Sequence, residues 1–325
     1  MPWPCSRRIE INQETLMNRC FKWFFGLSLW FTLVACSGGE DSHAPAAERI
    51  IPAQLGTELR AVHRKLPLEG AHNFRDLGGY LVPNDQRVMW GALYRSDALD
   101  ELTDEDVAYV SRLGIRTFVD FRTVQERLDG PDRLPASAME KSLPIEIALG
   151  PPGLNTGTSM DEIKDKVFSG EIDLSNTLVD INRALVTDFT ATYREFLLTL
   201  LEKDEGAVLF HCTAGKDRAG FAAALVLRIL GVPKERVIED YLLTNVFTEK
   251  ETEKILWQIR LASFFQADTD NIRQLLGVEE RYIVAAFDAI ESEWGSFDRY
   301  VSEGLGISAE EIARLRSIYL EPNSA

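Results

Sequence analysis

One stretch, Gly206-Ala-Val-Leu-Phe-His-Cys-Thr-Ala-Gly-Lys-Asp-Arg-Ala-Gly220, carries the strongest structural signal in this chain. It opens with an apolar run over 207–210, short enough for a strand that is buried on both faces. It closes with an apolar helical pattern over 218–230, which Gly231 ends before a proline. The pattern therefore predicts a strand, a short loop that starts at Cys212, and a helix.

This arrangement suits the binding of a tetrahedral anion. A loop that runs into a helix points several backbone N–H groups inward, and the helix dipole adds partial positive charge there. Such surroundings favour a thiolate, so Cys212 is the predicted nucleophile. Arg218 offers a planar fork that can hold two phosphate oxygens. The predicted phosphate-binding residues of the loop are Thr213, Ala214, Gly215 and Lys216.

The motif His211-Cys-x5-Arg218 after a strand resembles the loop of the cysteine-based protein tyrosine and dual-specificity phosphatases. Its fuller form, with Lys-Asp before the Arg, resembles their bacterial and fungal branch. Further segments similar to this branch are Asn73-Phe-Arg-Asp-Leu-Gly-Gly-Tyr80, Leu93-Tyr-Arg-Ser-Asp97 and Val119-Asp-Phe-Arg122 with Glu126. The resemblance covers the chain from about residue 66 to 320. It implies an α/β fold, with a small, mostly parallel sheet and helices on both faces.

The resemblance also implies roles for single residues. In this branch the loop Asp, here Asp217, protonates the leaving group. A more general arrangement of the superfamily places that acid upstream, where Asp180 lies, but Asp180 falls in a helical pattern and Asp217 is preferred. The supporting residues implied are His211, Arg75, Asp76 and Asp120. As an alternative, Asp120, Arg122 and Glu126 form only an ion-pair cluster at the end of a strand.

The implied reaction is hydrolysis of a phosphomonoester through a phosphocysteine, with no cofactor. A phosphorylated protein, above all a phosphotyrosine protein, is the first expected substrate. Lys216, expected as a positive charge at the loop rim, leaves a phosphoinositide or inositol phosphate as the alternative. At position 219 these loops usually have Ser or Thr, whereas this chain has Ala219. Slow turnover, or a phosphate-binding protein with little catalysis, therefore stays open, as does a purely structural envelope protein.

Composition limits the other possibilities. The chain has 325 residues, 45% of them hydrophobic, and a formal net charge of −16, which argues against a nucleic-acid partner. Its four histidines show no metal-ligand spacing, so no metal site is predicted. Three of the four cysteines lie within the first 36 residues, so they do not form a disulfide framework for the folded body.

The N-terminus reads as a targeting segment. Arg19 and Lys22 precede an apolar stretch that ends Leu33-Val-Ala-Cys36, which resembles a bacterial lipobox with Cys36 as the lipidated residue. A plain secretory signal or short anchor is the alternative, and Met17 is a possible second start. The expected organisation is a lipoprotein signal peptide over 1–36, a flexible tether over 37–65 and a phosphatase domain over 66–325. The expected location is the cell envelope, on the periplasmic side of the outer membrane rather than the inner membrane.

Flanking elements follow from local signals. Thr103-Asp-Glu-Asp106 predicts a capping box that starts a helix ending near Gly114, and 115–122 predicts the next strand. Apolar spacing from Leu185 to Leu200 predicts one long amphipathic helix before the 207–210 strand. Later helices over 233–246, 249–265 and 271–276 are expected as packed helices or as a lid over the site, and a last capped helix over 308–320.

Overall fold

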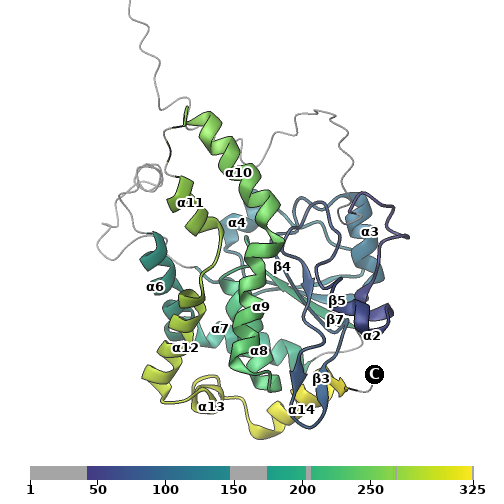
Figure 1. Ribbon diagram of the computed structural model, residues 1–325. Helices are drawn as coiled ribbons and strands as arrows, with labels where there is room; N and C mark the ends of the chain where they lie inside the picture. The colour runs from purple at the N-terminus through teal and green to yellow at the C-terminus, as the bar shows by residue number, and fades with distance from the viewer. Residues whose placement is uncertain (1–41, 147–173, 203–205, 266, 268, 324–325) are drawn as a thin grey trace, which may run out of the picture.

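The computed structural model describes residues 42–146, 174–202, 206–265, 267 and 269–323 (Figure 1). Its centre is a five-stranded sheet in the order β1-β4-β7-β5-β6. Four strands are parallel, and the short edge strand β1 (Arg75–Asp76) pairs antiparallel with β4. The parallel strands are β4 (Leu93–Ser96), β7 (Ala207–His211), β5 (Ile115–Asp120) and β6 (Met139–Ser142). The predicted small, mostly parallel sheet is confirmed.

The two faces of the sheet are covered by separate hydrophobic cores. Along β7, Val208 and Phe210 face a large core formed with helices such as α8 (Arg218–Leu230), whereas Ala207 and Leu209 face a smaller one with α3 (Asp104–Arg112). This alternation is the period-two pattern of a strand, and burial on both faces explains why its sequence is apolar throughout. The prediction of helices on both faces is confirmed, and β7 is the central strand (Figure 1).

A second, three-stranded sheet joins the C-terminus to the first hairpin. It has the order β2-β3-β8, with β2 (Leu81–Val82), β3 (Gln86–Val88) and β8 (Leu320–Pro322). The three-residue hairpin loop, 83–85, has Asn84 and Asp85 at positive φ of 64° and 53°, a conformation that Asn and Asp adopt more readily than most residues. The remaining helices are η1 (Pro52–Gln54), α2 (Thr57–Arg60), α4 (Val124–Asp129), α6 (Leu174–Thr187), α7 (Thr190–Leu201), α9 (Lys234–Phe247), α10 (Glu249–Ala262), α11 (Thr269–Leu276), α12 (Glu280–Trp294), α13 (Phe297–Arg299), η2 (Tyr300–Gly304) and α14 (Ala309–Tyr319).

Local end signals predicted the helix boundaries well. Thr103 forms the expected capping box of α3, and Ser308 forms the one of α14. Helix α8 has the predicted bounds, and Gly231 ends it in the left-handed conformation at φ 104°. The single long helix predicted before β7 is wrong, because the chain breaks between α6 and α7 at Phe189, which has φ −118° and ψ 17°. Residues on both sides of this break pack into the same core, which makes the apolar spacing look continuous.

The segment predicted as a flexible tether is packed against the domain over its described residues, 42–65. Ala46 and Ile51 are buried in the smaller core. The Arg49 guanidinium donates to Asp106 of α3 at 2.5 Å, and both side chains are fully buried. The tether prediction is therefore wrong for this part, since a buried ion pair and apolar contacts fix it to α3.

Predictions for the first 36 residues, including the lipobox at Cys36, lie outside the described residues. Among the helices that the structure describes, none combines the length and the apolarity needed to cross a bilayer.

Candidate active site

The predicted nucleophile lies where the central strand meets its helix. Cys212 follows the last residue of β7, and the loop 212–217 leads into α8. This is the carboxyl end of the parallel strands, the edge at which α/β proteins build their sites. The Cys212 side chain is only 2% exposed and belongs to the large core. Strand, loop and helix are arranged as the sequence predicts.

Three consecutive carbonyl groups of the loop are tied back to neighbouring segments. The pairs are Ala98 N with Thr213 O at 3.1 Å, Asn73 Nδ2 with Ala214 O at 3.1 Å, and Arg95 Nη2 with Gly215 O at 2.6 Å. Across a trans peptide bond the C=O and the following N–H point in opposite directions. Holding the carbonyls on the outside therefore turns the N–H groups of residues 214–216 toward the inside of the loop. Within the described residues, no hydrogen bond from the N–H groups of 213–218 to a backbone carbonyl of another segment is found.

The loop requires glycine at position 215. Gly215 has φ 67°, and a Cβ there would lie 2.6 Å from Asp97 N and from Ser96 O. Both the left-handed backbone and the close approach of β4 exclude a side chain. The predicted anion-binding loop is therefore rigid, since its centre is pressed against the end of a neighbouring strand.

Arg218 is held by Glu126, which the sequence analysis quoted in a family-like segment without assigning it a role in the site. Glu126 of α4 accepts from Nη1 and Nη2 of Arg218 at 2.8 Å each. Burial raises the pKa of Glu126, but hydrogen bonds from Arg218 and Thr213 outweigh it and lower that pKa to about 2. Burial also acts to lower the pKa of Arg218, but Glu126 and Cys212 reverse this effect and raise it above its ordinary value. Glu126 therefore holds the Arg218 guanidinium in place and favours its positively charged form.

The hydroxyl of Thr213 belongs to the same group. It donates to Glu126 Oε1 and accepts from Arg218 Nη2 at 3.2 Å. Glu126 itself is fixed by a capping box with Thr123 at the start of α4. This capping box was the available signal for Glu126, because it places the carboxylate directly after the strand that ends at Asp120.

The two candidate acids lie in different surroundings. Asp217 is in the loop itself, with Oδ2 at 2.6 Å from Lys216 Nζ and Oδ1 at 3.3 Å from Asn182 Nδ2. Asp180 is half-exposed on α6 and pairs with Arg183 at 2.8 Å. Only Asp217 is therefore placed beside the nucleophile. Lys216 is not the rim charge that the sequence suggested, because its side chain is 6% exposed and turned to Asp217.

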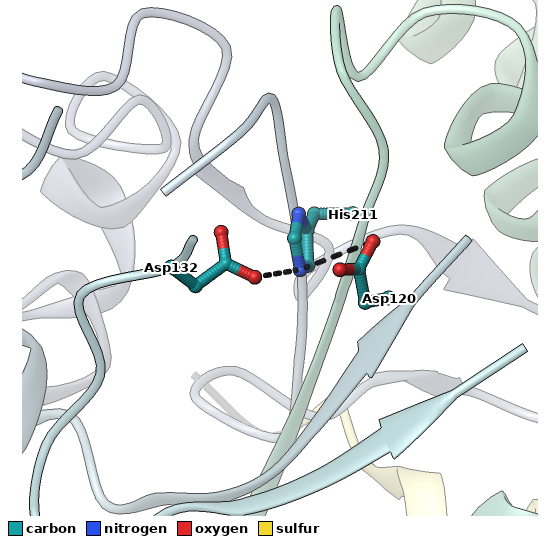
Figure 2. Close-up of side chains that lie close together, drawn as sticks. All are labelled: Asp120, Asp132 and His211. Carbon is teal, nitrogen blue, oxygen red and sulfur yellow. Dashed lines mark ion pairs between the residues drawn. The ribbon is translucent and has the colours of Figure 1, made fainter. Parts of the chain in front are cut away.

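His211 and Asp120 form a buried network under the loop with Asp132 (Figure 2). The Nε2 atom of His211 lies 3.3 Å from Asp132 Oδ2 and 3.8 Å from Asp120 Oδ1. These three side chains have the ligand types of a metal site, but Arg122 Nη2 lies 2.6 Å from Asp132 and 3.0 Å from Asp120. The Arg122 guanidinium thus already supplies a positive charge to both carboxylates. The network therefore orients the residue that precedes Cys212.

The resemblance implies Arg75 and Asp76 as supporting residues. In the part of the chain that the structure describes, neither side chain makes a hydrogen bond to the Cys212 loop. Arg75 is buried and donates to Asn73 Oδ1 at 2.6 Å, and Asn73 in turn holds the loop. Asp76 accepts from the N–H groups of Gly78 and Gly91 at 2.8 Å each. Burial raises the pKa of Asp76 to about 7, although these two hydrogen bonds oppose the rise. Asp76 thus stabilises the turn after β1.

The chain is similar in sequence to known phosphatases. A model of the tyrosine phosphatase family matches residues 66–321. The triple specificity protein phosphatase PtpB of Mycobacterium tuberculosis is 30% identical over 79% of this chain and 99% of its own length. A protein of Cupriavidus necator, provisionally named a tyrosine-protein phosphatase, is 29% identical over 85% of this chain and 95% of its own.

A solved structure of TpbA from P. aeruginosa covers 61% of this chain and 95% of its own, at 22% identity and a TM-score of 0.26, and this match adds nothing to the assignment. The family model spans residues 66–321, which include the Cys212 loop. The chain therefore belongs to the tyrosine phosphatase family and is a phosphoric monoester hydrolase.

Proposed function

We propose that this protein hydrolyses phosphotyrosine in proteins through a phosphocysteine intermediate. The Cys212 sulfur attacks phosphorus, an S–P bond forms, and the P–O bond to the tyrosine breaks as Asp217 gives its proton to the leaving oxygen. Water then attacks phosphorus, Asp217 takes the proton, and the S–P bond breaks to release phosphate. The inward N–H groups and Arg218 stabilise the charge on the oxygens in both steps.

One observation carries this proposal. The carbonyls of residues 213, 214 and 215 all accept hydrogen bonds from neighbouring segments, which turns the N–H groups that follow them toward the inside of the loop that Cys212 begins. Preorganised donors of this kind stabilise developing negative charge without rearranging during the reaction. A merely structural loop would gain nothing from leaving these donors unused.

The choice of phosphotyrosine is supported by the names of the relatives. The phosphoinositide alternative loses the support of Lys216, which is buried against Asp217. The test is a comparison of kcat/KM on peptides phosphorylated at Tyr, Ser or Thr and on phosphatidylinositol phosphates in mixed micelles. We expect the phosphotyrosine peptide to be preferred. A preference for the inositol lipids would replace this substrate assignment and leave the phosphocysteine chemistry intact.

Ala219 should make the second step slow. A hydroxyl at this position would donate to the departing thiolate, and a hydrogen bond to a charged group contributes about 1.5–3 kcal/mol. This corresponds to about ten- to a hundredfold in rate. Thr213 is not a substitute, because its hydroxyl donates to Glu126. We therefore expect a burst of p-nitrophenol in stopped-flow experiments, followed by slow steady turnover.

Ala219→Ser is expected to raise the steady rate by about ten- to a hundredfold and to shrink the burst. Ala223→Ser is the matched control, because Ala223 is also a fully buried alanine of α8 but lies one turn further from the loop. If the wild type shows no burst, and Ala219→Ser no gain over the control, another group already supplies the hydrogen bond.

We further propose that Cys36 anchors the protein to the cell envelope through a lipid, with the domain on the periplasmic side of the outer membrane. The apolar stretch that ends Leu33-Val-Ala-Cys36 supports this proposal. Cys36→Ala should abolish incorporation of radiolabelled palmitate and leave an unprocessed precursor on gels. Normal processing of the variant, with continued recovery in the membrane fraction, would contradict the lipid anchor.

A further inference from the structure

A buried cluster of charge lies under the Cys212 loop. Arg75 and Arg95 are fully buried, and Asp240 of α9 is 1% exposed. The carboxylate accepts from Arg75 Nε at 3.3 Å and from Arg95 Nη1 at 3.0 Å. The Tyr80 hydroxyl also donates to it, at 2.9 Å. Burial acts to raise the pKa of Asp240, but the two guanidinium groups outweigh burial and lower that pKa to about 2, so the carboxylate is ionised.

Two guanidinium groups therefore share one carboxylate. In the described part of the chain, no other carboxylate lies within the 4.0 Å of an ion pair from Arg75 or Arg95. The cluster has one positive charge in excess, in a place that is closed to water. An unbalanced charge is expensive there, so a counter-anion is expected close by.

The other cations of the loop already have carboxylate partners. Lys216 pairs with Asp217, and Arg218 pairs with Glu126. Arg95 differs, because it shares its carboxylate and uses Nη2 to hold the Gly215 carbonyl at 2.6 Å. The same Nη2 would lie 3.0 Å from a Cβ on Gly220, which places it against the first turn of α8, where the helix dipole is also positive.

The position of Arg95 points to Cys212 as the source of the counter-charge. Arg95 is the register partner of Phe210 across the parallel strands β4 and β7, two residues before Cys212, and it holds Gly215 of the same loop. Burial lowers the pKa of Arg95 to about 10, Arg75 adds to this effect, and negative charge at Asp240 and at Cys212 opposes it. A thiolate at Cys212 would therefore balance the cluster from the loop side. A phosphate bound by the loop would lie on the same side.

We propose that Arg95 is a positioning residue of this phosphatase with two roles. Its hydrogen bond fixes the Gly215 carbonyl, and its positive charge attracts anions to Cys212. The proposal deepens the phosphocysteine function and rests on it. Its charge component can nevertheless be measured without any turnover of substrate.

The experiment compares alkylation of Cys212 by iodoacetate, which is negatively charged, and by iodoacetamide, which is neutral. Both reagents form the same S–C bond and release iodide, so the ratio of their rates reports the local charge. The full-length protein is used at one fixed pH, and mass spectrometry follows the peptide that carries Cys212. We expect Arg95→Met to lower the iodoacetate-to-iodoacetamide ratio by about three- to tenfold. We expect kcat on p-nitrophenyl phosphate to fall by about ten- to a hundredfold.

Two further variants separate this role from a loss of stability. Arg95→Met leaves Asp240 paired with Arg75, so the variant is expected to fold. Arg95→Lys keeps the charge without the fork, and should keep the reagent ratio near wild type while kcat falls. Arg75→Met removes an equally buried guanidinium from the same carboxylate, but one with no bond to a loop carbonyl.

Arg75→Met should match the loss of thermal stability of Arg95→Met with a smaller effect on the reagent ratio and on kcat. Equal effects of Arg75→Met and Arg95→Met on both readouts would overturn the proposal. An unchanged reagent ratio in Arg95→Met would overturn it as well. If wild-type protein has no turnover but the ratio still falls in Arg95→Met, the proposed function fails and the charge role of Arg95 stands.

Discussion

Cys212→Ser is expected to lower turnover of p-nitrophenyl phosphate by about 10⁴-fold or more, because a serine hydroxyl in this loop is a far weaker nucleophile than a thiolate. Binding of phosphate or vanadate should persist. The hydrogen bonds that hold the loop come from Ala98, Asn73 and Arg95, and none of them involves the Cys212 side chain. The measurements are steady-state kinetics and isothermal titration with the oxyanion.

Cys212→Ser also discriminates between mechanisms. Turnover within a few fold of wild type would rule out a phosphocysteine and point to direct attack by water. Loss of both turnover and oxyanion binding would instead show that the substitution had disturbed the loop. Circular dichroism and the melting temperature are the controls for the folded state.

Asp217→Asn is expected to lower kcat by about 10²- to 10⁴-fold, the contribution of a well-placed general acid. The loss should be largest for phosphotyrosine and phenyl phosphate, whose leaving oxygens need a proton, and smallest for p-nitrophenyl phosphate. The basic limb of the pH–rate profile should flatten, because the group that must stay protonated has been removed. The single amide oxygen of the asparagine can accept from either Asn182 or Lys216 but not from both, so the melting temperature is measured beside kcat to separate loss of the acid from loss of stability.

Asp180→Asn is the matched control for this prediction, since it makes the same chemical change on α6. Asp180 is half-exposed, and its one ion pair within the described residues is with Arg183, so its substitution should change kcat by less than about twofold. If Asp180→Asn flattens the basic limb of the pH–rate profile and Asp217→Asn does not, Asp180 is the general acid and Asp217 is not.

The parts of the site that could be predicted from sequence are those whose structure depends on residues close together along the chain. The strand, Cys212, the loop and α8 are contiguous, and their end signals are local. The capping boxes of α3 and α14 are local in the same way. These features follow from hydrogen bonds between residues a few positions apart, so the sequence alone defines them.

The groups that hold the loop could not be predicted, because they come from far along the chain. Asn73 and Arg95 lie in motifs that the sequence singled out, but they reach carbonyls 141 and 120 residues later. Asp240 lies in no motif that the sequence analysis identified. Its role is visible only in the structure, where α9 brings its carboxylate to Arg75 and Arg95. The burial of Lys216 was missed for a related reason, since the pattern does not show that its side chain turns to Asp217.

The packing of residues 42–65 on the domain would limit how far the enzyme can work from the lipid anchor proposed at Cys36. The N–H of Ala46 is fixed to Glu105 at 2.7 Å, so nine residues, 37–45, would separate a lipid on Cys36 from the folded domain. The ten Cα-to-Cα steps from Cys36 to Ala46 span at most about 35 Å, whatever their conformation. A domain anchored in this way would stay within about that distance of the membrane surface. Its rate in the cell would then depend on the surface density of phosphorylated membrane proteins rather than on their concentration in the surrounding fluid.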